Sequence, residues 1–257
     1  MKTYSIIGAI IGDIIGSVYE QINTRSTTFP LFTERNRFTD DTVMTIAIAD
    51  WLLHGGDLPR IMQDWGEHRY PYRGYGGMFR KWLASDNPQP YNSYGNGGAM
   101  RVSPVGFYAQ TLEETLSLAR QTAMVSHNHP DGIVGAEAIA TSVFLARNGS
   151  NKEEIRHHIV SSYGYNLMLK CQDIPPRFTM KASITCPAAI IAFLDSSDYE
   201  SAIRLAISLG GDSDTIACMA GGIAAAYYGI PNSIVERART YLPDDMLAIV
   251  DEFDRRV

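Results

Sequence analysis

Apolar residues recur at intervals of three and four along most of the chain, which is the spacing of amphipathic and buried helices. Polar segments rich in Gly, Pro, Asn and Asp separate these stretches, and no stretch alternates apolar and polar residues as a half-buried strand does. The chain shows no internal repeat. The pattern predicts an all-α protein with helices over residues 5–20, 41–54, 58–68, 78–84, 112–125, 133–147, 152–161, 186–194, 199–209, 215–228, 231–241 and 244–255.

Long irregular segments interrupt this pattern at residues 70–101, which are rich in Gly and Tyr, and at residues 163–180. Long loops inside compact domains are usually functional or disordered, and the aromatic side chains of the first segment argue against disorder. Its tyrosines could pack within the loop or form a stacking wall for a base. The stretch from Tyr70 to Gly77 receives no role. Nothing resembles an interdomain linker, so we expect one domain over residues 1–257.

Composition narrows the class of protein. The chain has 257 residues, 45% apolar residues and a formal net charge of −6, which allows a sizeable core and provides no basic field for nucleic acid. Its three cysteines lack a C-x-x-C spacing, which argues against a disulfide framework and against a zinc site.

The N-terminal apolar run, Ile6–Ile15, follows Lys2 and loosely resembles a signal peptide. Asp13 interrupts the run, no cleavage site follows, and the run is too short to span a bilayer. We therefore expect a buried helix in a cytoplasmic protein that does not associate with membranes. Glycines at every fourth position from Gly8 to Gly16 would allow close packing on one face. Asp13 and Glu20 would share a face of the same helix, in its C-terminal half.

Two acidic clusters run directly into predicted helices, Thr39-Asp40-Asp41 and Asp212-Ser213-Asp214-Thr215. If the clusters converge, their carboxylates cannot share one pocket without cations, and ligands that are all oxygen select Mg²⁺, Mn²⁺ or Ca²⁺. Four carboxylates suit two divalent ions bridged by one Asp. The alternative is that each cluster only caps its own helix. A helix N-terminus repels a cation, so a metal site there would be built for function.

Three further features have two interpretations each. The glycine-rich stretch Gly95–Arg101 could wrap an anion or a nucleotide with backbone N–H groups, or form a tight turn. His127, at the end of a predicted helix, could contact a ligand or be structural. Glu20 could act in the site or be an ordinary surface carboxylate.

The sequence then shows a specific combination. Five segments occur in one order: Gly12–Glu20, Phe38–Thr42, Tyr94–Arg101, Ser126-His127 and Gly210–Thr215. Together they resemble the ADP-ribosylglycohydrolase family, over about residues 5 to 231. The resemblance implies a compact orthogonal bundle of helices with a cleft that holds a binuclear centre of Mg²⁺ or Mn²⁺. It also implies hydrolysis of the glycosidic bond at C1″ of ADP-ribose.

The resemblance assigns roles to individual residues. The implied metal ligands are Thr39, Asp40, Asp41, Asp212, Asp214 and Thr215. The implied contacts to ADP-ribose are Ser93, Tyr94, Gly95, Asn96, Gly97, Met100 and His127. The implied catalytic residues are Glu20, Asp41 and Asp212, of which Glu20 would gate the cleft.

The acceptor stays open between arginine, serine, a nucleic-acid base and a small metabolite. The expected partner is an ADP-ribosylated protein or a small ADP-ribosyl compound, nucleic acid enters only as a modified acceptor, and a monomer is favoured. One alternative is a two-metal phosphoesterase, although Ile216 stands where the Asp-x-Asp-x-Thr phosphatase pattern has Thr. Another is a non-catalytic module that binds ADP-ribose or confers immunity to a toxin.

Overall fold

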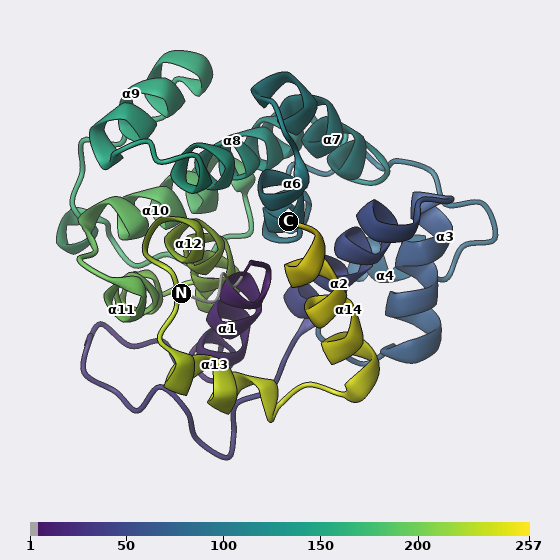
Figure 1. The fold of residues 1–257 in the computed structure, drawn as a ribbon, viewed down its shortest axis with the longest axis horizontal. Coiled ribbons are helices and arrows are strands. Elements are labelled where there is room, and N and C mark those ends of the chain that lie inside the picture. Colours follow the sequence, from purple (N-terminus) through teal and green to yellow (C-terminus); the bar gives the residue numbers. More distant parts are fainter. Residues whose placement is uncertain (1–4) are drawn as a thin grey trace.

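The computed structural model describes residues 5–257, and helices make up most of that range (Figure 1). Residues 5–257 contain no strand, only an isolated bridge between Gly95 and Lys181, so the predicted all-α class is confirmed. The first four residues of the predicted 1–257 domain lie outside the described range. The α-helices are α1 (Ile7–Gly16), α2 (Asp40–His54), α3 (Leu58–Gln63), α4 (Gly77–Leu83), α5 (Gly97–Met100), α6 (Ser103–Tyr108), α7 (Leu112–Met124), α8 (Pro130–Arg147), α9 (Lys152–Tyr163), α10 (Ala182–Asp195), α11 (Tyr199–Ser208), α12 (Ser213–Tyr228), α13 (Asn232–Arg239) and α14 (Asp244–Arg256).

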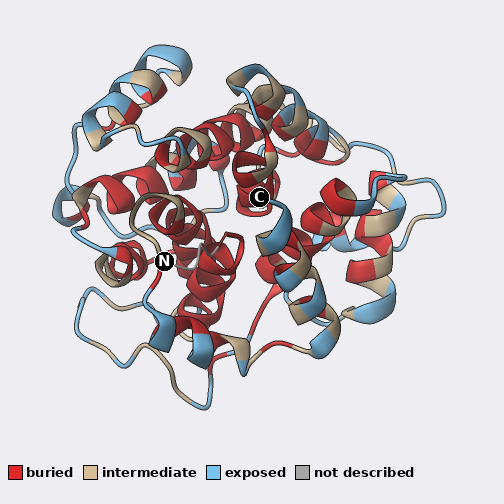
Figure 2. Cartoon of the chain, in the orientation of Figure 1, coloured by how far each residue is buried: buried red, intermediate tan, exposed pale blue. Residues whose placement is uncertain are grey.

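Helices α1 and α12 lie side by side in the middle of the molecule, and every residue of α1 is buried (Figure 2). The glycines predicted to permit close packing make this contact. A Cβ atom at Gly12 would lie 2.0 Å from the carbonyl oxygen of Ala217, and one at Gly16 would lie 2.4 Å from the Cα of Asp214. The two backbones therefore approach more closely than any side chain larger than hydrogen would allow.

The predicted helix over residues 5–20 is wrong at its end, because α1 stops at Gly16 and Glu20 lies in the turn that follows. The amide of Asn23 donates to the carbonyl oxygens of Tyr19 (2.7 Å) and Gly211 (3.0 Å). This side chain binds the turn to the loop before α12, which competes with continuation of the helix. Glu20 is thereby placed beside the second acidic cluster rather than above Asp13.

The predicted helix over residues 58–68 is divided into α3 and a π-helix, Asp64–Arg69. Within the π-helix the indole N–H of Trp65 donates to Asp50 of α2 at 2.7 Å, and the amide of Tyr70 donates to the Trp65 carbonyl. A tertiary contact thus favours the wider turn over the local α-helical pattern.

Helix α10 begins at Ala182, four residues before the predicted start, and Pro187 lies inside it. The added turn is held from outside, because the amide of Ala182 donates to the carbonyl of Tyr94 at 3.0 Å. Within residues 70–101, α4 matches the helix predicted over residues 78–84, and α5 is a short helix that was not predicted. No helix within residues 5–257 combines the length and the hydropathy needed to cross a bilayer. The three cysteines are free and buried.

Candidate active site

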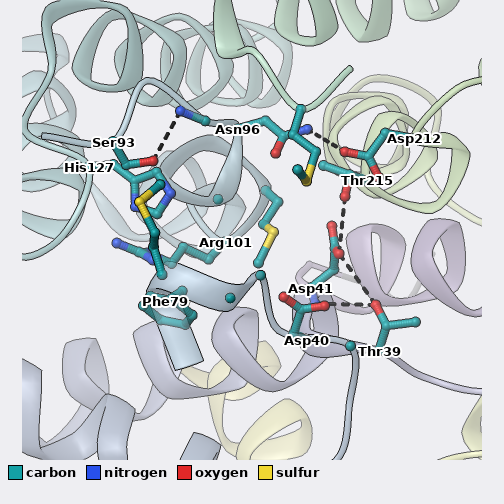
Figure 3. Close-up of a pocket in the computed structure, with 18 of the residues that line it drawn as sticks. Thr39, Asp40, Asp41, Phe79, Ser93, Asn96, Arg101, His127, Asp212 and Thr215 are labelled. Carbon is teal, nitrogen blue, oxygen red and sulfur yellow. Dashed lines mark hydrogen bonds between the residues drawn. The ribbon is translucent and has the colours of Figure 1, made fainter. Parts of the chain in front are cut away.

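The first acidic cluster opens α2. Thr39 is the N-cap residue, and its hydroxyl oxygen accepts from the amide of Asp41 at 3.4 Å. One carboxylate oxygen of Asp41 lies within 3.3 Å of the Thr39 hydroxyl and 3.2 Å of the Thr215 hydroxyl (Figure 3). Its other oxygen is buried and has no partner among the described residues. An unpaired buried carboxylate oxygen is costly, which makes it a candidate ligand for a cation.

The second acidic cluster opens α12. Asp212 occupies the N-cap position but makes no capping hydrogen bond, and its carboxylate instead accepts from the side-chain amide of Asn96 at 2.7 Å. The Thr215 hydroxyl joins this helix to Asp41 of α2. Helix capping alone therefore does not account for the two clusters, and the structure brings them together (Figure 3).

The carboxylates form two groups that share one residue. In the first, oxygens of Asp13, Asp41 and Asp214 lie within 4.8 Å of one another. In the second, the same limit of 4.8 Å joins Glu20, Asp212 and Asp214. Asp214 belongs to both groups and so connects them. Asp40 lines the same cleft, at the first residue of α2, and is partly exposed.

Burial raises the pKa of every aspartate in the two groups. The pKa values of Asp41 and Asp214 are raised well above the usual value, first by burial and then by neighbouring carboxylates. The pKa of Asp40 is raised well above its usual value by the same causes. The pKa values of Asp13 and Asp212 are raised by burial and lowered in part by hydrogen bonds. Such a cluster needs protons or cations to stay together.

The loop Ser93–Gly97, called the ligand loop below, forms one wall of a cleft. The two carboxylate groups form the acidic floor of the same cleft. Ser93 and Asn96 are buried, and the backbone amide of Asn96 donates to the Met180 carbonyl at 2.8 Å. Gly95 and Gly97 face the imidazole of His127, so that a Cβ at Gly97 would lie 2.7 Å from Nε2. Tyr94 is half exposed, and its ring is flanked by the Lys181 ammonium at 5.6 Å and by the His129 ring.

All the residues that the resemblance proposes for the site line one cleft of about 1080 Å³. The segment Tyr72–Gly77, which has no role from its sequence, forms part of the rim. The carbonyl of Arg73 accepts from the amide of Asp40 at 2.8 Å, and the Arg73 guanidinium lies 3.8 Å above the centre of the Phe38 ring. The rim is therefore attached to the first acidic cluster.

Two residues of this region were missed from the sequence. Asp13 accepts hydrogen bonds from the amides and the hydroxyls of Thr39 and Thr42, and so holds the start of α2. A carboxylate inside an apolar run was a signal for a buried partner. Arg101 is fully buried beneath the ligand loop. Apart from the adjacent glycines, nothing in the sequence indicates that this arginine is buried.

The ADP-ribosylglycohydrolase family model matches residues 3–257. The chain is 30% identical to the bovine (Bos taurus) ADP-ribosylhydrolase ARH3, over 95% of this chain and 90% of that protein. It is 24% identical to the ADP-ribosylarginine hydrolase Tri1 of Pseudomonas putida (strain GB-1), over 88% of this chain and 70% of that protein.

A solved structure described as an ADP-ribosylglycohydrolase-related protein complex superimposes with a TM-score of 0.75 at 26% identity. The superposition covers 99% of this chain and 97% of that one. Sequence and fold thus agree over the same range, and the chain belongs to the ADP-ribosylglycohydrolase family.

Proposed function

We propose that this protein is a metal-dependent hydrolase that cleaves the glycosidic bond at C1″ of ADP-ribose and so reverses ADP-ribosylation. The observation that carries the proposal is the pair of carboxylate groups around Asp214 beneath a glycine loop, in a chain of this family. The relatives named ADP-ribosylhydrolase and ADP-ribosylarginine hydrolase support the same reaction class.

The donor set fits two divalent cations, Mg²⁺ or Mn²⁺. Its atoms are carboxylate and hydroxyl oxygens, which hard ions prefer, and the unpaired oxygen of Asp41 is free to bind one. The residues that would hold the ions are Thr39, Asp40, Asp41, Asp212, Asp214 and Thr215. When bound, such ions orient ribose hydroxyls and lower the pKa of a coordinated water.

The chain's own residues then bind and orient the substrate. Backbone N–H groups of the ligand loop, Ser93–Gly97, would hold the pyrophosphate, with Met100 and His127 against the same ligand. Tyr94, half exposed at the cleft wall, provides a ring on which adenine can stack.

The proton chemistry falls to carboxylates beside the reacting carbon. Glu20 is partly exposed and lies next to Asp212, so it can accept a proton from the attacking water and gate the cleft. Asp41 and Asp212 would assist from the floor, where the Asn96 amide orients Asp212. Departure of the acceptor passes through an oxocarbenium-like transition state, which nearby carboxylates stabilise.

The test is release of ADP-ribose from a panel of defined substrates with ADP-ribose on arginine, serine, a nucleic-acid base or a small metabolite. The reaction is run with Mg²⁺, with Mn²⁺ and with a chelator. Activity on one linkage should disappear in chelator and in Asp214→Ala, while the distant variant Asp195→Ala retains it. Full activity in chelator would refute the metal-dependent mechanism.

Two other outcomes identify the alternatives. Metal-dependent binding of ADP-ribose without hydrolysis of any linkage would indicate a non-catalytic reader or immunity module. Release of phosphate from simple phosphoesters would indicate a two-metal phosphoesterase. The expected monomer and the cytoplasmic location stay predictions, to be checked by light scattering and by fractionation.

A further inference from the structure

Arg101 is a buried cation beside the cleft. Its side chain is fully buried, and Nη2 donates to the Thr122 carbonyl at 2.7 Å and to the Ser126 hydroxyl oxygen at 3.0 Å. Nε and Nη1 have no hydrogen-bond partner among residues 5–257, and the guanidinium lies 5.6 Å from the centre of the Phe79 ring. Figure 3 shows Arg101 and Phe79 below His127. A buried charge of this kind usually has a structural or chemical role.

Ser126 links Arg101 to His127. Its hydroxyl oxygen lies 2.8 Å from Nδ1 of His127 and accepts from Arg101, which can only donate. If Nδ1 carried the proton and donated to this oxygen, the buried serine hydroxyl would have no acceptor within the described chain. An unsatisfied buried donor is strongly disfavoured, so the hydroxyl donates to Nδ1 and the imidazole proton resides on Nε2.

The position of Nε2 makes this tautomer functional. No hydrogen bond reaches Nε2 from any residue between 5 and 257, and the atom faces the ligand loop. A Cβ at Gly97 would lie 2.7 Å from Nε2 and one at Gly95 would lie 3.7 Å away. The lack of side chains on these glycines lets the ligand loop approach the imidazole closely, and His127 lines the cleft.

The same arrangement keeps the imidazole neutral. Burial and then the charge of Arg101 hold the pKa of His127 well below its usual value. The Ser126 hydroxyl and the rings of Phe79 and Tyr91 lie against the imidazole, and none of them is an anion at neutral pH. A neutral Nε2–H group is a hydrogen-bond donor at any pH near 7.

We propose that Arg101 and Ser126 are positioning residues that hold His127 as the neutral Nε2–H tautomer, so that Nε2–H donates a hydrogen bond to an oxygen of the bound ADP-ribose. Arg101 orients the serine hydroxyl, the serine fixes the ring, and the glycine loop presents the ligand oxygen. Only the identity of the ligand rests on the proposed function. The tautomer is a property of the free protein and can be tested without any activity.

The first test is ¹⁵N NMR of the histidine rings in the ligand-free protein, with the His127 signals assigned by their loss in His127→Gln. At neutral pH Nδ1 should show the shift of an unprotonated ring nitrogen and Nε2 that of a protonated one. A protonated Nδ1, or an imidazolium, would overturn the proposal whatever reaction the protein catalyses.

The second test is calorimetric binding of ADP-ribose. Ser126→Ala should mix the two tautomers in the NMR spectrum and weaken binding about fivefold to tenfold, the effect of one lost hydrogen bond. The matched control is Ser142→Ala, which removes another buried hydroxyl, one that donates to the Ala138 carbonyl. This variant should change neither the His127 tautomer nor the affinity for ADP-ribose. Normal tautomer and affinity in Ser126→Ala would refute the positioning role, and melting curves show whether each variant is folded.

Discussion

Asp13 offers the sharpest test of how the acidic floor is built. Its Oδ2 accepts from the amides of Thr39 (2.8 Å) and Thr42 (3.1 Å) and from the Thr42 hydroxyl, while Oδ1 accepts from the Thr39 hydroxyl at 2.6 Å. A carboxylate on α1 thus caps α2 from outside. Asp13→Ala leaves two buried amides unsatisfied, which costs about 2–6 kcal/mol. Removal of the charge relieves Asp40 and Asp41 by roughly 1–2 kcal/mol, so we expect a net loss of about 3 kcal/mol.

Asp13→Asn separates the hydrogen bonds from the charge. Its carbonyl oxygen can replace Oδ2 and keep both amides satisfied, so the loss should be about 1 kcal/mol. The assay is urea unfolding in chelator and again with Mn²⁺, and the control is Asp198→Ala, an exposed N-cap of α11 worth about 1 kcal/mol in both conditions. If Asp13→Asn loses as much unfolding free energy as Asp13→Ala in chelator, the capping explanation is wrong. If the two Asp13 variants lose the same unfolding free energy, and lose it only with Mn²⁺, Asp13 is a metal ligand instead.

The other predictions concern the wall and the core. Gly97→Ala should weaken ADP-ribose binding about tenfold in calorimetry, because its Cβ would lie 2.7 Å from Nε2 of His127, whereas Gly77→Ala, with nothing within 4 Å, should bind normally. His127 has a lowered folded-state pKa, so its contribution to stability is present above the unfolded pKa and lost as pH falls below about 6.5. His127→Gln should therefore reduce the slope of unfolding free energy between pH 7 and 5 by up to about 1.4 kcal/mol per pH unit, and an unchanged slope would contradict a buried neutral ring. Gly12→Ala should cost more than about 3 kcal/mol in urea unfolding, because the Ala217 backbone cannot move aside; a loss below about 1 kcal/mol would show that the helices separate easily.

The helices were predictable because their signal is local. The three- and four-residue spacing of apolar positions in α11, α13 and α14 reports the buried face of each helix. Errors arose where a distant group decides the local structure. The π-helix Asp64–Arg69 is fixed by Trp65, whose indole N–H donates to Asp50. Helix α10 starts early because its first amide, that of Ala182, donates to the carbonyl of Tyr94.

The same limit applies to the site. The acidic clusters at residues 39–41 and 212–215 could be paired from the sequence because both combine adjacent acids with threonine, and the family resemblance supplied the order. Asp13 could not be placed, since its partners Thr39 and Thr42 follow a loop whose path the sequence does not specify. The relation between Arg101 and Ser126 depends on how α5 packs against α7, and periodicity carries no information on that contact.

The glycine face of α1 and the acidic floor are one structural feature. Asp13 lies one turn before Gly16, and a Cβ at Gly16 would lie 2.4 Å from the Cα of Asp214, so the closest approach of α1 and α12 occurs where the carboxylates meet. Repulsion among these groups opposes that approach, as their raised pKa values show. Burial of the apolar face along the whole of α1 favours it. The packing of α1 against α12 therefore brings the carboxylates together, and a floor fixed by two buried helices would favour cation binding through preorganisation.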